Sequence, residues 1–188
     1  MGFLVADEVA RRRDAAFESA PADALVARVR GPVPVLVVKP LTFMNLSGAA
    51  VGALARYYRI ETPDLLVVTD DVNLPLGRLR ARPGGSAGGH NGLKSVAEDL
   101  GTDDYARLRV GVGRGDERRD LADHVLARFE DDERPVIETA ILRAADAVET
   151  FLEDGIEVVM NRFNADAAGA GRQTLPAEDA GSTKDGQS

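Results

Sequence analysis

The chain has 188 residues, which suits a single domain, and it contains no cysteine, which excludes disulfides and thiolate metal sites. No apolar run approaches the ~20 residues that span a bilayer, and the apolar start at 2–6 is too short for a signal peptide. The formal net charge of −8 argues against a nucleic-acid partner. We therefore expect a soluble, cytoplasmic protein with no membrane association.

The charge is unevenly distributed, and this weakens the argument against a nucleic acid. Residues 130–157 contain ten acidic residues and two arginines, whereas residues 78–119 contain nine basic residues and six acidic ones. The basic excess surrounds a glycine-rich run at 84–89, where a phosphate contact would be useful. From the charge pattern alone, solvated surface charge is the simpler explanation.

The hydrophobic periodicity predicts an alternation of helices and strands. In chain order, we expect a helix at 3–13, strands at 24–30 and 33–38, a helix at 47–58, strands at 65–68 and 78–82, a helix at 91–100, a strand at 108–112, and helices at 121–129 and 133–152. Gly155 then precedes a last segment at 156–163, and residues 164–188 should be a disordered acidic tail. This alternation is typical of one α/β domain at 1–163, with an open sheet in three layers.

Four of these elements carry sharper expectations. The strand at 33–38 is nearly all apolar and should be buried on both faces. Ser47 is the expected N-cap of the next helix, and the alternating strand at 78–82 should lie at an exposed sheet edge. The first helix should turn an apolar face toward the core, made of Phe3, Leu4, Ala6, Val9 and Ala10.

Polar side chains follow two of the predicted strands. Asp70 comes directly after the strand at 65–68, and Asn45 lies a few residues after the strand at 33–38. Because ligands of open α/β sheets bind at the carboxyl ends of strands, both side chains could lie on one rim. There Asp70 would orient an imidazole, although the turn chemistry of residues 70–75 also allows it a purely structural role.

The segment around Asn45 allows two interpretations. Asn45 stands between the apolar Met44 and Leu46, so its amide either satisfies backbone groups or faces a ligand. Phe43 and Met44 are, in the same way, either core residues or part of a substrate platform.

The glycine-rich run lets the backbone approach a ligand and leads into a helix whose first N–H groups favour anions. Its spacing matches neither a Walker A loop nor the dinucleotide fingerprint. His90 and Asn91 stand at the junction with the helix, where a histidine is either structural or catalytic. His124 is interpreted as a structural residue of a helix. The two histidines, without a carboxylate at ligand spacing, make no metal motif.

Four ordered blocks resemble those of the bacterial peptidyl-tRNA hydrolase family, between about Gly2 and about Phe163. They are TFMNLSG at 42–48, Asp70 followed by VNLP at 72–75, GGHNGLK at 88–94, and RLRVGVG at 107–113. The resemblance implies hydrolysis of the ester between peptide and tRNA in peptidyl-tRNA, which recycles the tRNA. It further implies a monomer without metal, organic cofactor or protein partner, and a mixed, mostly parallel sheet with helices on both faces.

The resemblance also implies roles for individual residues. Asp70 holds the histidine that acts as general base, and Phe43, Asn45 and Asn91 contact the tRNA end and the peptide backbone. One of the two amides helps to stabilise the oxyanion. Further contacts to the substrate, chiefly to its phosphates, are assigned to Met44, Arg82, Lys94 and Arg107.

The family's opening segment of about 20 residues has no counterpart ahead of Gly2, and with it the first strand and the base histidine are missing. A start placed too late in the gene explains this, and so does natural loss; we favour the first. Two alternatives remain for the chain as given. It is a non-catalytic relative that binds tRNA without turnover, or His90 replaces the missing base beside Asp70.

Overall fold

The described residues, 1–113 and 129–165 of the computed structural model, contain two sheets of three strands each. The first has the order β1–β2–β3, with β1 at Phe17–Ala20, β2 at Ala24–Val29 and β3 at Val35–Pro40. The second has the order β4–β6–β5, with β4 at Leu66–Asp71, β5 at Leu79–Arg82 and β6 at Ala106–Gly111. The helices are α1 (Gly2–Arg12), α2 (Ser47–Tyr58), α3 (Asn91–Leu100), α5 (Arg134–Asp154) and α6 (Ile156–Phe163), with 3₁₀ turns η1 (Met44–Leu46) and η2 (Thr62–Asp64).

The strand pairings correct the expected sheet. Three of the described pairs, β1–β2, β2–β3 and β5–β6, are antiparallel, whereas β4–β6 is parallel. The connection between β2 and β3 is too short for the crossover that parallel strands need, so this pair is a hairpin. The fold is therefore a mixed α/β fold, and the expectation of a single, mostly parallel sheet is wrong.

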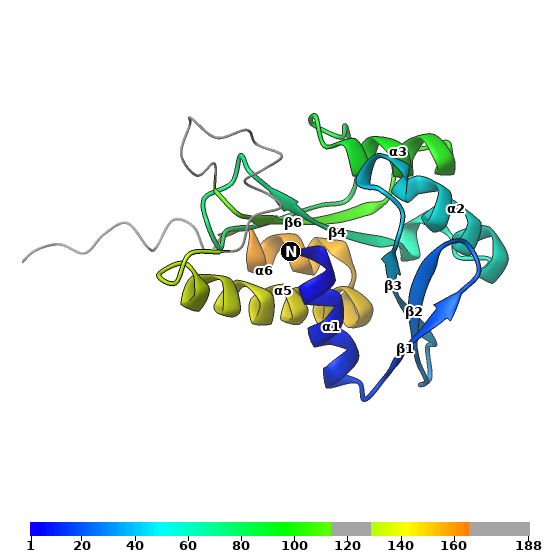
Figure 1. Ribbon diagram of the computed structural model, residues 1–188, viewed down its shortest axis with the longest axis horizontal. Coiled ribbons are helices and arrows are strands. Elements are labelled where there is room, and N and C mark those ends of the chain that lie inside the picture. The colour runs from blue at the N-terminus through cyan, green and yellow to red at the C-terminus, as the bar shows by residue number, and fades with distance from the viewer. Residues whose placement is uncertain (114–128, 166–188) are drawn as a thin grey trace, which may run out of the picture.

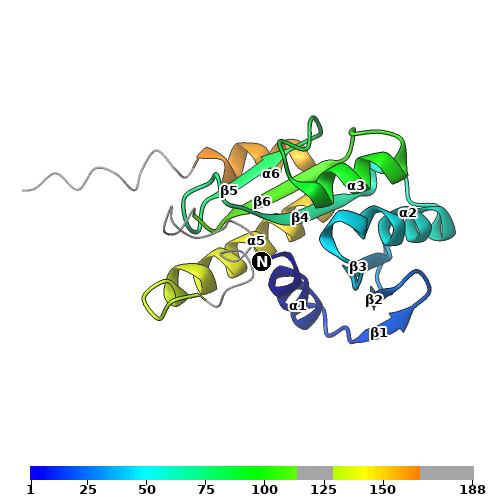
Figure 2. The same ribbon diagram turned by 45° about the horizontal axis from the view of Figure 1, so that its top comes forward.

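Helices cover both faces of the β4–β6–β5 sheet (Figure 1, Figure 2). On one face, Leu108 and Val110 of β6 are fully buried in a cluster with α1, α5 and α6. On the other face, Leu93 and Val96 of α3 form a second cluster, against which Val67 of β4 packs. This sheet carries the larger part of the apolar core.

The β1–β2–β3 sheet has a thinner core. Ala50 and Leu54 of α2 pack against Ala24 and Val26 of β2. Most of β3 is only half-buried, so the expected burial on both faces is wrong. Its one buried residue, Lys39, is paired with Asp7 of α1, and its ammonium lies 4.2 Å from the centre of the Phe17 ring.

Several helix and strand expectations are confirmed, and others need correction. The helix at 91–100 has the expected bounds, and β5 lies at a sheet edge with the expected alternation of buried and exposed residues. Ser47 is the first residue of α2, not its N-cap. In α1 the buried face includes Val5, whereas Phe3 and Leu4 are exposed, because the helical phase differs from the expected one.

Two expectations fall outside the described residues. Residues 114–128 contain His124 and nearly all of the helix expected at 121–129, and residues 166–188 contain nearly all of the expected tail.

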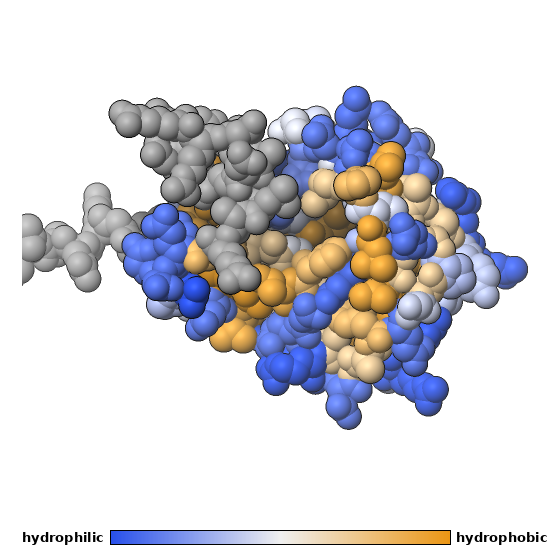
Figure 3. Space-filling model, viewed as in Figure 1, coloured by the Kyte–Doolittle hydropathy of each residue, from blue (hydrophilic) through white to orange (hydrophobic). Residues whose placement is uncertain are grey.

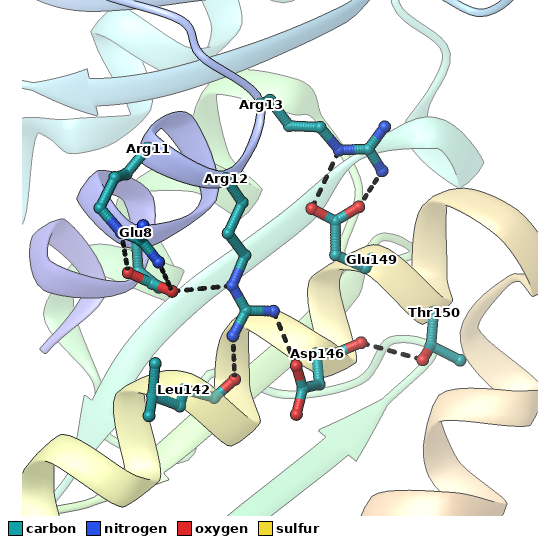
Figure 4. A network of polar contacts seen from close by, with 8 residues as sticks. All are labelled: Glu8, Arg11, Arg12, Arg13, Leu142, Asp146, Glu149 and Thr150. Carbon is teal, nitrogen blue, oxygen red and sulfur yellow. Dashed lines mark hydrogen bonds and ion pairs between the residues drawn. The ribbon is translucent and has the colours of Figure 1, made fainter.

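An ion-pair network joins α1 to α5 (Figure 4). Glu8 accepts hydrogen bonds from Arg11 and Arg12, and Arg12 Nη1 lies 2.7 Å from Asp146 Oδ1. Arg13 pairs with Glu149. The hydrogen bonds from Arg11 and Arg12 lower the pKa of the Glu8 carboxyl to about 2.

Candidate active site

The η1 turn lies against the start of α3. A Cβ built on Gly92, in the first turn of α3, would lie 2.5 Å from Met44 Sδ and 3.0 Å from the His90 ring. Glycine allows this close packing, because an added Cβ would require the Met44 side chain or the His90 ring to shift. This contact brings together two of the predicted site segments, at Asn45 and at His90–Asn91.

Asp70 and Asp71 end β4 with opposite orientations, as neighbouring residues of a strand do. The buried Asp71 accepts a hydrogen bond from Asn73 N–H and pairs with Arg109 Nη1 at 3.0 Å. Burial acts to raise the pKa of the Asp71 carboxyl, but these two partners outweigh it and lower the pKa. The turn role that the sequence allowed for Asp70 therefore belongs to Asp71.

Asp70 keeps its carboxylate available for other partners. Its Oδ1 lies 3.9 Å from the amino group of Met1, whose side chain is buried. The negative charge of Asp70 also acts on His90, whose pKa it raises. Asp70 and His90 therefore lie close enough for the charge of one to act on the other.

His90 is the N-cap of α3, and its Nδ1 accepts a hydrogen bond from Leu93 N–H at 3.2 Å. Burial lowers the pKa of its imidazole, more than Asp70 raises it. The neutral ring with Nδ1 as acceptor carries its proton on Nε2. His90 therefore presents an N–H donor, which argues against its use as a substitute base.

Two arginines of β6 hold the glycine-rich loop. Arg107 donates to Ser86 O and Asp103 O, each at 2.8 Å, and Arg109 Nη2 donates to Ala87 O at 2.9 Å. Both arginines point to one face of the sheet, because they are two residues apart on a strand. The loop that leads to His90 is thereby fixed to β6 at two consecutive carbonyls.

A family model for peptidyl-tRNA hydrolase matches residues 1–171. The chain belongs to the peptidyl-tRNA hydrolase family. A relative with that name from Symbiobacterium thermophilum is 45% identical over 166 residues, which are 87% of this chain and 88% of the relative. One from Dehalococcoides mccartyi is 48% identical over 133 residues, or 69% of this chain and 70% of the relative.

Solved structures of the family agree with the fold. The crystal structure of peptidyl-tRNA hydrolase from Acinetobacter baumannii superimposes with a TM-score of 0.78 at 26% identity, covering 87% of this chain and 84% of that one. The main functional interpretation is thus supported: this chain is a hydrolase of the peptidyl-tRNA hydrolase family. The comparisons give no support to the non-catalytic alternative. The family match begins at residue 1, so it does not support the expectation of a missing opening segment.

The predicted substrate residues of η1 and α3 are exposed. Phe43 is 81% exposed, and Asn45 and Asn91 are also exposed. These side chains face solvent beside the η1–α3 contact and are therefore accessible to a substrate. Leu41, Met44 and Leu46 are exposed as well, and Figure 3 shows apolar residues gathered on this face of the molecule.

The three predicted phosphate contacts of this family member divide into two kinds. Arg82 and Lys94 are exposed, although Lys94 Nζ lies 3.8 Å from Glu98 Oε1 one turn further along α3. Arg107 is only 2% exposed and is bound to backbone carbonyls. The assignment of Arg107 to substrate phosphate is therefore wrong, because the glycine-rich loop covers it.

Arg109 and Asp71 are site residues to which the sequence analysis gave no role. Together they link the end of β4 to the loop ahead of His90. The alternation of arginine with Leu108 and Val110 in β6 was a signal that both arginines share one face. That this face meets the loop was not visible in the sequence.

The described residues show two further absences. No described helix is both long and apolar enough to cross a membrane. Within the same part of the chain, no three His, Asp or Glu side chains are grouped so that they could hold a metal ion.

Proposed function

We propose that this chain hydrolyses the peptide–tRNA ester at the rim formed by Asp70, η1 and the start of α3. The observation that carries this proposal is the close approach of Met44 in η1 to Gly92 in α3, since Asn45 and Asn91 are the chain neighbours of these two residues. Two amides with donor groups, next to a carboxylate, suit an ester whose carbonyl oxygen becomes negatively charged.

Each polar group has a separate task in this proposal. Asp70 orients the imidazole of the general base and favours its protonated form after it has taken a proton from water. Asn45 or Asn91 donates an N–H to the oxyanion of the tetrahedral intermediate. His90 supports this with its Nε2–H, because its Nδ1 is held by Leu93. Ester cleavage then releases the tRNA 3′ hydroxyl and the peptide acid.

The apolar side chains and the exposed cations bind the ends of the substrate. Phe43 and Met44 offer an exposed apolar surface on which a base of the tRNA end or a peptide side chain can pack. Arg82 is exposed at the end of β5, just ahead of the glycine-rich loop, and Lys94 lies on the first turn of α3. Both are suited to phosphate contacts near the reacting ester.

Two further observations concern the surroundings of Asp70. The amino group of Met1 lies 3.9 Å from Asp70 Oδ1, so the start of α1 borders the proposed rim. Among the described strands, β4, which carries Asp70, pairs only with β6.

The hydrolase proposal is tested by the turnover of N-acetylated aminoacyl-tRNA with the native protein. Asp70→Asn and Asn91→Ala should each lower kcat/KM at least about tenfold, because orienting and oxyanion groups act in the transition state. Asp154→Asn and Asn161→Ala are matched controls on exposed positions of α5 and α6, and they should leave the rate unchanged. Unchanged rates in both site variants would remove these role assignments, and tRNA binding without any turnover would favour the non-catalytic alternative.

We propose in addition that the protein works as a cytoplasmic monomer, with its folded domain at 1–163 and an acidic tail at 164–188. Light scattering at micromolar concentration should give the mass of one chain. A concentration-dependent mass of two chains would contradict the monomer.

A further inference from the structure

The segment from Ala24 to Ile60 has a charge opposite to that of the whole chain. It contains no acidic residue, in a chain whose formal net charge is −8. Its five basic residues are Arg28, Arg30, Lys39, Arg56 and Arg59. Lys39 is buried and paired with Asp7, whereas the four arginines are exposed. Within this segment the positive charge is therefore not offset by any acidic residue of its own, which favours contact with a polyanion.

The four arginines gather around the C-terminal end of α2. Ala24 and Val26 of β2 pack under α2, and Arg28 and Arg30 continue the same face of the strand past the helix. Arg28 Nη2 donates to the Tyr58 hydroxyl at 3.0 Å, which joins β2 to the last turn of α2. Together with Arg56, Tyr57 and Arg59 these residues form what we call the α2-end patch.

The α2-end patch combines an aromatic face with uncompensated charge. Tyr57 is 73% exposed, and its ring is held edge-to-face on Tyr58 with 4.9 Å between ring centres. Arg30 and Arg59 have no ion-pair partner among the described residues, whereas Arg28 lies 3.1 Å from Glu18. An exposed, fixed tyrosine between arginines suits base stacking and phosphate contact at one place.

Arg59 occupies a position that ordinarily favours glycine. It follows the last residue of α2 with φ 55° and ψ 45°, in the left-handed region. Glycine is the usual residue at this place after a helix, and a side chain there carries a conformational cost. The backbone conformation at position 59 would thus favour glycine, so the presence of arginine there is not explained by folding alone.

A row of side chains along one face of η1 and α2, small between its two ends, connects this patch with the candidate active site. We call this row the stripe. Leu46, Ala49, Ala53 and Tyr57 follow the helical repeat, and none of these positions is buried. The stripe begins at η1 and ends at the patch, roughly 17 Å away at 1.5 Å per residue. It carries no acidic side chain and no large group between its ends, so a stacked single strand of nucleic acid can follow it. Figure 1 shows α2 leading away from η1 toward one end of the molecule.

We propose that the α2-end patch is a second RNA-binding surface, which contacts tRNA several nucleotides away from the 3′ end bound at η1. Tyr57 stacks on a base, and Arg30 and Arg59 contact phosphates. At about 3.4 Å per nucleotide along a stacked strand, the patch lies about five nucleotides from the active site. This inference rests on the proposed function, because it takes peptidyl-tRNA as the substrate.

The test compares a long and a short probe. Deacylated full-length tRNA reaches both η1 and the patch, whereas a trinucleotide with the sequence of the tRNA 3′ end reaches only η1. Fluorescence anisotropy measures the affinity of the full 188-residue chain for each probe between 50 and 200 mM salt, a range in which phosphate contacts change affinity strongly. Binding of neither probe by the unchanged protein would contradict the proposed function itself.

Three variants separate the roles of ring and charge. Tyr57→Ala should weaken tRNA binding at least about fivefold, the loss of one stacked base, while Tyr57→Phe retains the affinity. Arg59→Gly removes the charge at a position that suits glycine, and should lower the slope of log affinity against log salt by about 0.7–0.9. None of the three should change trinucleotide binding.

A charge-matched control lies at the far end of the fold. Arg134, exposed at the start of α5, is remote from α2 in Figure 1, so Arg134→Ala should leave tRNA affinity and salt slope unchanged. The inference is overturned if the tRNA affinity of the patch variants equals that of the unchanged protein. It is also overturned if the patch variants weaken binding of the trinucleotide as much as binding of tRNA. A basic patch with an exposed tyrosine could bind a membrane instead, so loss of binding to phosphatidylserine vesicles with unchanged tRNA affinity would overturn the inference as well.

Discussion

The two sheets differ in how many helices pack on them. The sheet with more helices carries most of the core, whereas the exposed recognition residues lie on the part with fewer. The β4–β6–β5 sheet has α1, α5 and α6 on one face and α3 on the other. The β1–β2–β3 sheet is packed by α2, through a small cluster around Leu54. The exposed apolar residues of η1 and the α2-end patch both belong to this second, thinner part.

The candidate active site lies where these two parts meet. Asn45 comes from the loop that follows β3, whereas Asp70 and His90 belong to the part with the large core. The buried groups Asp71 and Arg109 fix the large-core side of the site through three hydrogen bonds. The opposite side, at η1, contains no buried residue. We infer that one side of the site is rigid and orients the catalytic groups, while the other adapts to the substrate.

The largest expected effect compares one leucine from each core. Leu108→Ala removes a fully buried side chain of β6, and should lower the free energy of unfolding by about 3–5 kcal/mol. Leu54→Ala in the thin cluster should cost only about 2–3 kcal/mol, since an edge cluster collapses more easily around a lost side chain. Urea unfolding followed by circular dichroism measures both. Equal losses would contradict the division into a thick and a thin core.

A smaller effect is expected at the junction of the two parts. A Cβ at Gly48, in the first turn of α2, would lie 2.0 Å from Ser95 O of α3, where Gly48 N–H now donates to Ser95 Oγ. Gly48→Ala should therefore force the helices apart, lower stability by ~1–3 kcal/mol and slow hydrolysis by moving η1. Gly31→Ala is the control, because its Cβ would make an ordinary contact at 3.7 Å. A Gly48→Ala protein with unchanged stability and rate would show that the helix junction does not position η1.

The sequence predicted the thick part of the molecule better than the thin part. The helix at 91–100 and the edge strand β5 followed from periodicity, because in each a clear apolar face meets the core. β1 was missed because its four residues include one large apolar side chain, Phe17, and its place in the sheet comes from pairing with β2. The antiparallel order could not be read from strand patterns, because it depends on which edges meet.

The candidate site was predictable only in part, from its sequence motifs. The motifs located Asn45, Asp70, His90 and Asn91, since each follows a strand or begins a helix. Arg107 was misassigned because it was taken as one of the basic residues around the glycine-rich run, and such residues are mostly exposed. Its burial depends on the glycine-rich loop folding back over β6, which is a tertiary contact between residues 21 apart in the chain.

A third prediction concerns the pH dependence of the contact between α1 and α5. The Glu8 carboxyl has a pKa of about 2 in the fold, against an ordinary 4.5, because Arg11 and Arg12 donate hydrogen bonds to it. Its stabilising contribution is therefore fully present above pH ~4.5 and is lost as the pH falls through ~2. The difference in unfolding free energy between the unchanged protein and Glu8→Gln should be constant near pH 6 and vanish toward pH 2. A difference that does not change with pH would contradict the role of this carboxylate.

The smallest expected effect on stability is at Phe43. This residue separates a role in stability from a role in substrate recognition most clearly. Because its ring is 81% exposed, Phe43→Ala should change the free energy of unfolding by no more than about 0.5 kcal/mol. If the ring packs on the substrate, KM should nevertheless rise, with kcat little changed, since packing of this kind stabilises the bound substrate and the transition state alike. Thermal unfolding and steady-state kinetics of the same preparation separate the two quantities. A loss of stability without a change in KM would assign Phe43 to the fold, and the thin part would then lose its clearest recognition residue.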